Sequence, residues 1–120
     1  MKKLFLLLAF VTGAATLTQA QKSSKTVTIK TPTVQCESCK QRIETYLAKE
    51  DGVYKTTVDY KRKVTKVSFW TDKTNIENVK TAIANAGYDA DDVAANQDSY
   101  NKLPKCCKRP EDGGGGMKKN

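Results

Sequence analysis

Two strand-like segments joined by a short polar turn constrain the fold of this chain more than any other feature. Val53 to Asp59 and Lys63 to Trp70 are rich in β-branched and aromatic residues, and the turn between them reads Tyr60-Lys61-Arg62. This pattern is typical of a β-hairpin. The segments on either side of the hairpin then decide the architecture.

A helical pattern lies on each side of the hairpin. Before it, apolar residues recur at spacings of three and four from about Ser38, the expected N-cap, and Asp51-Gly52 ends that helix. After it, Thr74 or Asn75 caps a second helix, which Gly87 terminates. The apolar stripes consist of Ile43, Tyr46 and Leu47 in the first helix and of Ile76, Val79, Ala82, Ile83 and Ala86 in the second.

Strand-like segments also lie at both ends of this region. Thr26 to Lys30 alternates apolar and polar residues, the period of a half-buried strand, and Tyr88 to Val93 is predicted as a short strand. The order β-α-β-β-α-β predicts an α+β fold, a ferredoxin-like sandwich with two helices on one face of a four-stranded antiparallel sheet. About 70 residues arranged in this way bury an adequate but modest core.

The first twenty residues have the features of an export signal. Lys2 and Lys3 supply the positive start, Leu4 to Val11 is an unbroken apolar run, and Thr18-Gln19-Ala20 presents small residues at the cleavage positions. The apolar run is well short of the roughly 18 residues of a spanning helix, which argues against the alternative, a membrane anchor. We therefore predict an exported protein, periplasmic or secreted, with no stable membrane insertion after signal removal.

The predicted organisation has four parts. Residues 1–20 are the signal peptide, 21–25 a polar lead-in, 26–93 the domain, and 94–120 a tail that contains Cys106-Cys107 and a glycine-rich end. Within the tail, the isolated apolar residues Tyr100 and Leu103 are expected to attach it to the domain. From Glu111 onward the glycine-rich composition predicts a flexible segment.

The charge of the chain excludes one class of partner. Without the signal, 19 basic and 13 acidic residues remain, and both signs are interspersed along the domain. A nucleic-acid-binding protein would gather its basic residues on one face with aromatic residues between them. Interspersed charge and export both argue against nucleic acid and favour an ordinary solvated surface.

Cys36 and Cys39 form a C-x-x-C pair where a loop meets the first predicted helix. The unpaired N–H groups and the partial positive charge of a helix N-terminus favour thiolates. Two thiolates across an open loop suit a soft ion that accepts low coordination, such as Cu(I), Ag(I) or Hg(II), with Zn(II) and Cd(II) as alternatives. A structural zinc site takes four ligands, and the chain has no histidine to supply them.

Two other roles are open for this pair. Export favours oxidation, so Cys36 and Cys39 could form a local disulfide, although so short a loop restricts the unfolded chain very little. The other role is thiol-disulfide exchange that uses both Cys36/Cys39 and Cys106/Cys107. That class typically has a longer α/β chain with a tryptophan beside the motif, whereas the one tryptophan here is Trp70.

Residues 26–93 resemble the heavy-metal-associated domain family, which includes copper chaperones, copper-pumping ATPases and the periplasmic mercury-binding protein. The resemblance rests on the loop cysteines, on Gly52-Val53 at the second strand, and on Ala86-Gly87-Tyr88 at the end of the second helix. It implies that Cys36 and Cys39 hold the ion, with Cu(I) the first expectation. It also implies that the ring of Tyr88 lies near them and limits solvent access.

The loop departs from the usual G-M-T-C-x-x-C motif of this family, because it reads Thr33-Val34-Gln35-Cys36-Glu37-Ser38-Cys39. Val34 stands in place of the methionine that plugs into the core, and we expect it to do the same. Glu37 adds a negative charge beside the two cysteines. A partner-binding module that has lost its metal is a third reading of such a loop.

Cys106 and Cys107 form the second cysteine pair, which Lys105, Lys108 and Arg109 surround with positive charge that stabilises thiolates. In the predicted topology the last strand ends far from the cysteine loop, but the following residues extend to roughly 43–47 Å, enough to return. We predict that the tail adds one or two sulfur ligands or exchanges disulfides with the first pair. The alternative is a strained bond between the two adjacent cysteines, or a bond to another molecule.

These features together predict a metal-binding protein and not an enzyme, since histidine is absent and the carboxylates are scattered. The expected mechanism is capture of the ion by two thiolates. Handover then follows by stepwise ligand exchange with cysteines of a partner, which we expect to be a membrane metal transporter or another metal-binding protein.

Overall fold

The computed structural model describes residues 23–114 of the chain. The predicted export signal at residues 1–20 and the last part of the glycine-rich end lie outside this range. Within it, no helix is long and apolar enough to cross a membrane.

The sheet contains three antiparallel strands, β1 (Ser24–Lys30), β2 (Val53–Asp59) and β3 (Val64–Trp70), in the order β1-β3-β2. The predicted hairpin of β2 and β3 is confirmed. Its turn ends at Lys63, whose φ of 60° lies in the left-handed region. The central strand β3 pairs with β1 along its whole length, so the core-facing residues of all three strands share one face of the sheet.

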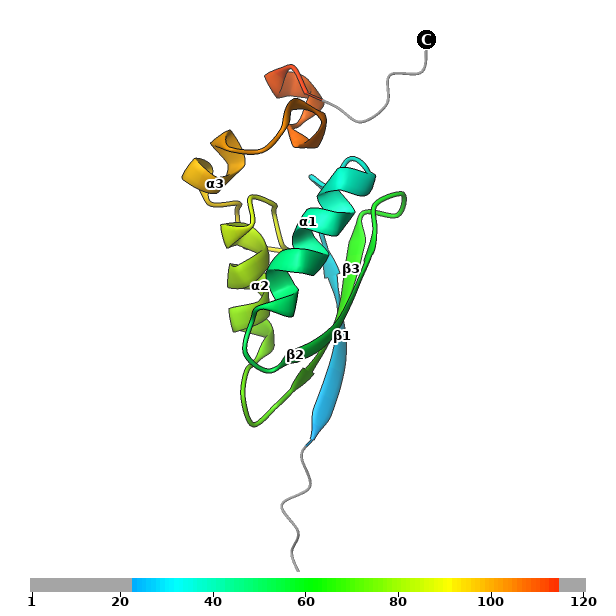
Figure 1. Ribbon diagram of the computed structural model, residues 1–120, viewed down its shortest axis with the longest axis vertical. Coiled ribbons are helices and arrows are strands. Elements are labelled where there is room, and N and C mark those ends of the chain that lie inside the picture. The colour runs from blue at the N-terminus through cyan, green and yellow to red at the C-terminus, as the bar shows by residue number, and fades with distance from the viewer. Residues whose placement is uncertain (1–22, 115–120) are drawn as a thin grey trace, which may run out of the picture.

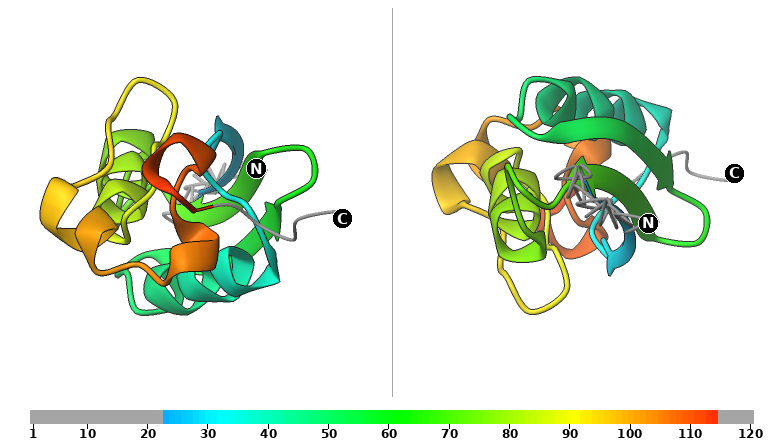
Figure 2. Two further views of the ribbon diagram at one scale, coloured as in Figure 1. Left: turned by 90° about the horizontal axis from the view of Figure 1, so that it is seen from above. Right: turned by 90° about the horizontal axis from the view of Figure 1, so that it is seen from below.

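Helices α1 (Glu37–Ala48) and α2 (Ile76–Asn85) both cover that face (Figures 1 and 2). The buried residues of α1 recur every four positions, and those of α2 follow the predicted stripe. The buried core between the helices and the sheet includes Ile29, Ile43, Leu47, Val58, Val67, Phe69, Val79 and Ile83. Burying this apolar stripe against the sheet is the main source of the stability of the two helices.

The predicted helix boundaries are correct for α2 and wrong at the start of α1. The side chain of Asn75 caps α2 by accepting a hydrogen bond from the N–H of Asn78 at 2.9 Å. In α1 the N-cap is Cys36 and not Ser38, because the backbone of Cys36 is extended and helical geometry begins at Glu37. The first cysteine therefore lies at the boundary of loop and helix.

The predicted fourth strand is not found in the described part of the chain. Residues 88–93 form a single bridge between Ala90 and Val93, because the chain reverses at Asp91, whose φ is 51°. Asp91 donates its N–H to the carbonyl of Lys30 at 2.8 Å, and its side chain accepts from the N–H of Lys30 at 2.7 Å. This segment makes no ladder with the sheet and bonds to it at the end of β1. The α+β, ferredoxin-like arrangement is otherwise confirmed, with three strands in place of four.

The reversal at Asp91 also corrects the expected path of the tail. Because Asp91 pairs with Lys30, which immediately precedes the cysteine loop, the chain does not travel to the opposite end of the sheet. Instead the tail folds over the start of α1 as helix α3 (Gln97–Asn101) and two short 3-10 helices, η1 (Lys105–Cys107) and η2 (Pro110–Asp112) (Figures 1 and 2). Glu111 and Asp112 thus belong to a helical turn, where the sequence predicted a flexible segment.

Apolar contacts attach the tail to the domain. Tyr100 and Leu103 are both buried, with 6% and 5% of their surface exposed. The side chain of Leu103 lies so close to Gly87 that a Cβ there would be 3.1 Å from it, and the φ of Gly87 is 106°. Glycine at this position therefore ends α2 and also makes room for the tail.

Candidate functional site

The first cysteine pair lies where the loop after β1 turns into α1. Cys36 is the N-cap and is half-buried, whereas Cys39 lies in the first turn of the helix and is fully buried. Their sulfur atoms are 3.5 Å apart, and all four cysteines of the chain are free thiols. The helix start thus presents two adjacent sulfur atoms, one of which is open to solvent.

The second cysteine pair lies directly beside the first. The Sγ of buried Cys107 is 3.9 Å from the Sγ of Cys36, and the thiol of Cys36 donates to the carbonyl of Cys106 at 3.7 Å. The sulfur atoms of Cys106 and Cys107 are 3.9 Å apart. Those of Cys36, Cys106 and Cys107 all lie within 4.8 Å of one another. This group joins one cysteine of the loop to both cysteines of the tail, and Cys39 adjoins it through its 3.5 Å contact with Cys36.

The thiols of this cluster differ in acidity. Contact with the thiol of Cys107 lowers the pKa of Cys39 to about 5, an effect that burial opposes. The same contact, together with burial, raises the pKa of Cys107 well above its usual range. Burial raises the pKa of Cys36. At neutral pH the thiolate form is therefore favoured at Cys39, and the protonated form at Cys107 and Cys36.

Val34 and Tyr88, the two residues expected to surround the cysteines, are both fully buried. Val34 points into the core, and its carbonyl accepts a hydrogen bond from the ammonium group of Lys63. The hydroxyl of Tyr88 is buried with no hydrogen-bond partner of good geometry. Burial raises the pKa of Tyr88, and the nearby thiols of Cys107 and Cys39 act in the same direction. The hydroxyl of Tyr88 thus lies beside the thiols of Cys107 and Cys39 in the interior of the protein.

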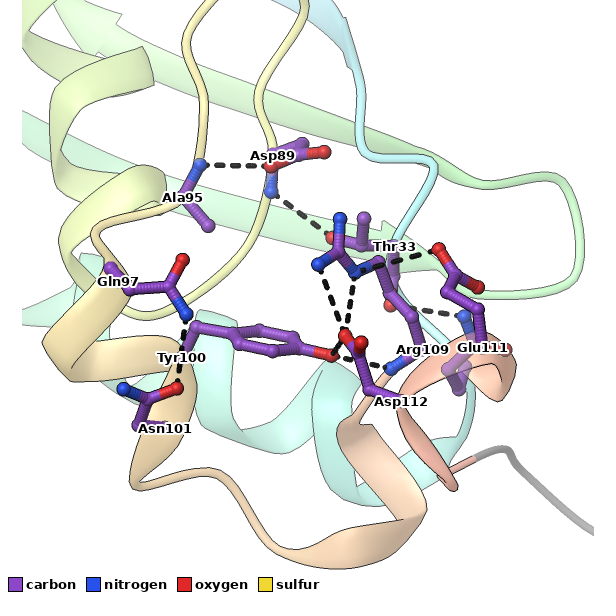
Figure 3. A network of polar contacts seen from close by, with 10 residues as sticks. Thr33, Asp89, Ala95, Gln97, Tyr100, Asn101, Arg109, Glu111 and Asp112 are labelled. Atoms are coloured by element: carbon purple, nitrogen blue, oxygen red, sulfur yellow. Dashed lines mark hydrogen bonds and ion pairs between the residues drawn. The ribbon is translucent and has the colours of Figure 1, made fainter.

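Hydrogen bonds tie the cysteine loop to the segment that contains Tyr88. The hydroxyl of Thr33 accepts from the N–H of Asp89 at 3.0 Å, and the carboxylate of Asp89 accepts from the N–H of Ala95 at 2.8 Å (Figure 3). The hydroxyls of Thr31 and Thr65 are 3.0 Å apart and hold the start of the loop against β3. The backbone around the first cysteine pair is therefore held by the fold itself.

A polar group that we call the tail latch, made of Tyr100, Arg109 and Asp112, holds the second cysteine pair. The hydroxyl of Tyr100 donates to the carboxylate of Asp112 at 2.5 Å and accepts from the N–H of Arg109 at 2.8 Å. The guanidinium of Arg109 lies 3.0 Å from the same carboxylate and 5.0 Å from the centre of the Tyr100 ring (Figure 3). Its hydrogen bond from Tyr100 and the charge of Arg109 hold the pKa of Asp112 below its usual range.

The sequence prediction named all four cysteines, Val34 and Tyr88, and the structure brings all of them together. It missed the tail latch, since Asp112 was assigned to a flexible segment and Arg109 was considered only for its charge. The spacing of these residues follows no periodic pattern, so only the isolated aromatic Tyr100 in a polar stretch signalled that the segment was attached.

Comparisons with known proteins identify relatives of the domain. The family model described as heavy-metal-associated domain matches residues 26–89. The periplasmic component of the mercuric transport protein of Shewanella putrefaciens is 39% identical over 88 residues, which are 73% of this chain and 93% of that protein. Its counterpart in Salmonella typhi is 36% identical over the same shares of both chains.

Two solved structures agree with the fold. Oxidized MerP from Ralstonia metallidurans CH34 is 29% identical, with a TM-score of 0.54, and the match covers 57% of this chain and 94% of that one. The CopZ metallochaperone is 26% identical, with a TM-score of 0.53 and coverage of 55% and 98%. This likeness across the whole domain favours metal binding over thiol-disulfide exchange. Because the family match ends at residue 89, Cys106 and Cys107 lie beyond it.

Proposed function

The chain belongs to the heavy-metal-associated domain family, and on this premise we propose that it binds a soft heavy-metal ion of the Cu(I) or Hg(II) class through the thiolates of Cys36 and Cys39. The observation that carries the proposal is the pair of sulfur atoms 3.5 Å apart at the start of α1, inside a domain of this family. Ag(I), Zn(II) and Cd(II) are the further candidates.

The donor set supports a soft ion. In the described residues, the one group of three or more candidate ligands that lie close together consists of cysteines alone. Thiolates select soft ions, whereas carboxylates and carbonyls suit Mg²⁺ and Ca²⁺. The low pKa of Cys39 supplies one thiolate at neutral pH, and the helix N-terminus stabilises it further. Binding of the ion then displaces the proton of Cys36.

The different exposure of the two cysteines supports a route for the ion. Cys36 is half-buried and Cys39 is fully buried, so an incoming ion meets Cys36 first and then Cys39. Release begins at the same exposed cysteine, when a thiolate of the acceptor attacks the ion and replaces Cys36. The protein acts as a carrier and not as an enzyme, and the acceptor is a membrane metal transporter or another metal-binding protein.

We place this activity outside the cytoplasm, in the periplasm or secreted. Residues 1–20 support export by their sequence, and several relatives are named as periplasmic components of mercuric transport. If this is correct, the mature protein isolated from an expressing bacterium begins at Gln21 and is recovered by osmotic shock, and deletion of residues 2–20 leaves the protein in the cytoplasm. Recovery of the full chain in the cytoplasmic fraction would contradict the proposal.

Metal titration of the reduced protein tests the central claim. We expect one Hg(II) or Cu(I) to bind per chain in competition with a thiol chelator, and Cys36→Ser and Cys39→Ser each to weaken binding by at least about 100-fold, since each removes one of the two thiolates on which the proposal rests. Ser38→Ala is the matched control, because Ser38 lies between the two cysteines in the first turn of α1 and its side chain is exposed. Unchanged affinity in both cysteine variants would refute the proposed function.

A further inference from the structure

We infer that Cys106 and Cys107 are additional ligands, so that the tail closes over the first cysteine pair and the ion is held by three or four sulfur atoms. This inference rests on the proposed function, because it concerns the same ion at the same place. The inference differs from the proposed function in the number of ligands and in the part of the chain that supplies them. Both tail cysteines lie beyond the family match at residues 26–89.

The spacing of the sulfur atoms is the first support. With a metal–sulfur distance of about 2.3 Å, ligand sulfurs lie about 3.8–4.0 Å apart in a tetrahedral or trigonal site and about 4.6 Å apart in a linear one. The distance from Cys36 to Cys107 is 3.9 Å, as is that from Cys106 to Cys107, and Cys36 and Cys39 are 3.5 Å apart. Cys36, Cys106 and Cys107 therefore have the spacing of three ligands around one ion, with Cys39 beside them as the fourth candidate, whereas a linear site requires Cys36 and Cys39 to separate.

The local structure of the tail is the second support, because it holds the two cysteines in place. Helix η1 is closed by a hydrogen bond from the N–H of Cys107 to the carbonyl of Pro104 at 2.9 Å. The carbonyl of Cys106 accepts from the thiol of Cys36, which joins the tail directly to the loop. Cys107 is fully buried although it lies in a polar segment. The local structure of the tail thus holds Cys107 against the other thiols and away from solvent.

The tail latch is the third support. Its hydrogen bonds and ion pair join α3 to η2, and the N–H of Gly114 also donates to the carbonyl of Arg109 at 3.1 Å. At Gly114 a Cβ would lie 2.3 Å from the carbonyl oxygen of Lys108, so only glycine permits this closure. These contacts on both sides of η1 restrict where Cys106 and Cys107 can be.

The charge around the cluster is compatible with several thiolates. A divalent ion with three or four thiolates carries a net negative charge, which needs compensation in a partly buried site. Lys105, Lys108 and Arg109 lie next to Cys106 and Cys107 in the chain. The ammonium group of Lys63 reaches the carbonyl of Val34 on the other side of the loop. Positive residues thus flank the two cysteines in the tail sequence, and a further ammonium group, from the β2–β3 turn, contacts the loop of the first pair.

The experiment counts sulfur ligands directly. The reduced protein is loaded with less than one equivalent of Hg(II), and X-ray absorption gives the number of sulfurs and the mercury–sulfur distance. We expect three or four sulfurs in the wild-type protein and two, at a shorter distance, in the double variant Cys106→Ser/Cys107→Ser, with affinity at least about ten-fold lower. Asp98→Asn is the matched control, since Asp98 is an exposed acidic residue of α3 away from the latch.

The variants separate this inference from the proposed function. Two sulfurs in the wild-type protein, with binding abolished by Cys36→Ser, would overturn the tail ligands and leave the proposed function intact. Unchanged affinity in Cys36→Ser and in Cys39→Ser would overturn the tail ligands and the proposed function together.

A latch variant covers the case in which the double cysteine variant does not fold. Asp112→Asn keeps all four cysteines but removes the charge that pairs with Arg109. We expect its mercury site to shift toward two sulfurs, because a loosened tail no longer holds Cys106 and Cys107 beside the ion. An unchanged sulfur number together with a detached tail, measured by hydrogen exchange at residues 105–113, would also overturn the inference.

Discussion

The two cysteine pairs meet in one cluster, but different kinds of structure hold them. Cys36 and Cys39 lie on a loop and a helix that the sheet, the core residue Val34 and backbone hydrogen bonds hold in place. Cys106 and Cys107 lie on a single 3-10 turn that depends on Leu103 and on the side chains of the tail latch. The first pair can be displaced only if the domain unfolds, whereas the second can be displaced when a few contacts open.

This difference suggests a division of roles. A site held by the whole domain keeps its geometry when an acceptor approaches. A segment held by few contacts can leave, so that the acceptor's thiolates reach the ion. Substitutions in the two regions should therefore have separable effects, global for the domain and local for the tail.

The largest effect is expected for Ile43→Ala in the domain. Ile43 is fully buried on α1, one turn after Cys39, and its loss leaves a cavity between helix and sheet. We expect the free energy of unfolding to fall by about 2–5 kcal/mol, measured by urea denaturation. Both cysteine pairs should lose their order together. A loss below about 0.5 kcal/mol, the effect of a surface substitution, would contradict the assignment of Ile43 to the core.

A smaller and local effect is expected for Tyr100→Phe in the tail. The change removes the hydroxyl that links Arg109 and Asp112 but keeps the buried ring. We expect the tail to open more readily by about 1–2 kcal/mol, which is the effect of losing a part-buried hydrogen bond. Trypsin cleavage at Lys105 and Lys108 should accelerate about ten-fold, while the urea midpoint of the domain stays the same. Equal cleavage rates in both proteins would show that the latch does not hold the tail.

The smallest effects come from two equivalent caps, one in each region. Asn75 and Asn96 cap α2 and α3 in the same way, each accepting a hydrogen bond from the N–H three residues later. We expect Asn75→Ala to lower the global free energy of unfolding by about 1 kcal/mol. Asn96→Ala should change only hydrogen exchange and proteolysis in residues 97–113. If Asn96→Ala lowered global stability as much as Asn75→Ala, tail and domain would unfold as one unit.

Much of the fold was predictable because it depends on local patterns. Apolar spacings of three and four located both helices, and alternation located the hairpin. Two of the errors have local causes that sequence patterns represent poorly. At the start of α1, helical geometry begins one residue before the expected cap because Cys36 already has the extended backbone of an N-cap. At the end of the domain, Asp91 adopts a left-handed conformation that turns the predicted fourth strand back on itself.

The candidate site was predictable only in part. The spacing of Cys36 and Cys39 and the Ala86-Gly87-Tyr88 segment identified the loop and its aromatic neighbour. The basic residues around Cys106 and Cys107 indicated reactive thiols, and the length of the tail showed that they could reach the loop. No local pattern indicated that Arg109, Asp112 and Tyr100 would combine, because their contacts join residues from two short helices of the tail.

The sequence alone determined the helices, the hairpin, the fold class and the identity of the candidate ligands, since these follow from the chemistry and spacing of neighbouring residues. Only the tertiary structure decided that Cys107, 71 positions after Cys36 in the chain, lies 3.9 Å from it. Such a contact exists because the chain reverses at Asp91, Leu103 packs on Gly87 and the tail latch closes η1 over the start of α1. The energies of those contacts depend on packing between distant segments, which no local pattern contains.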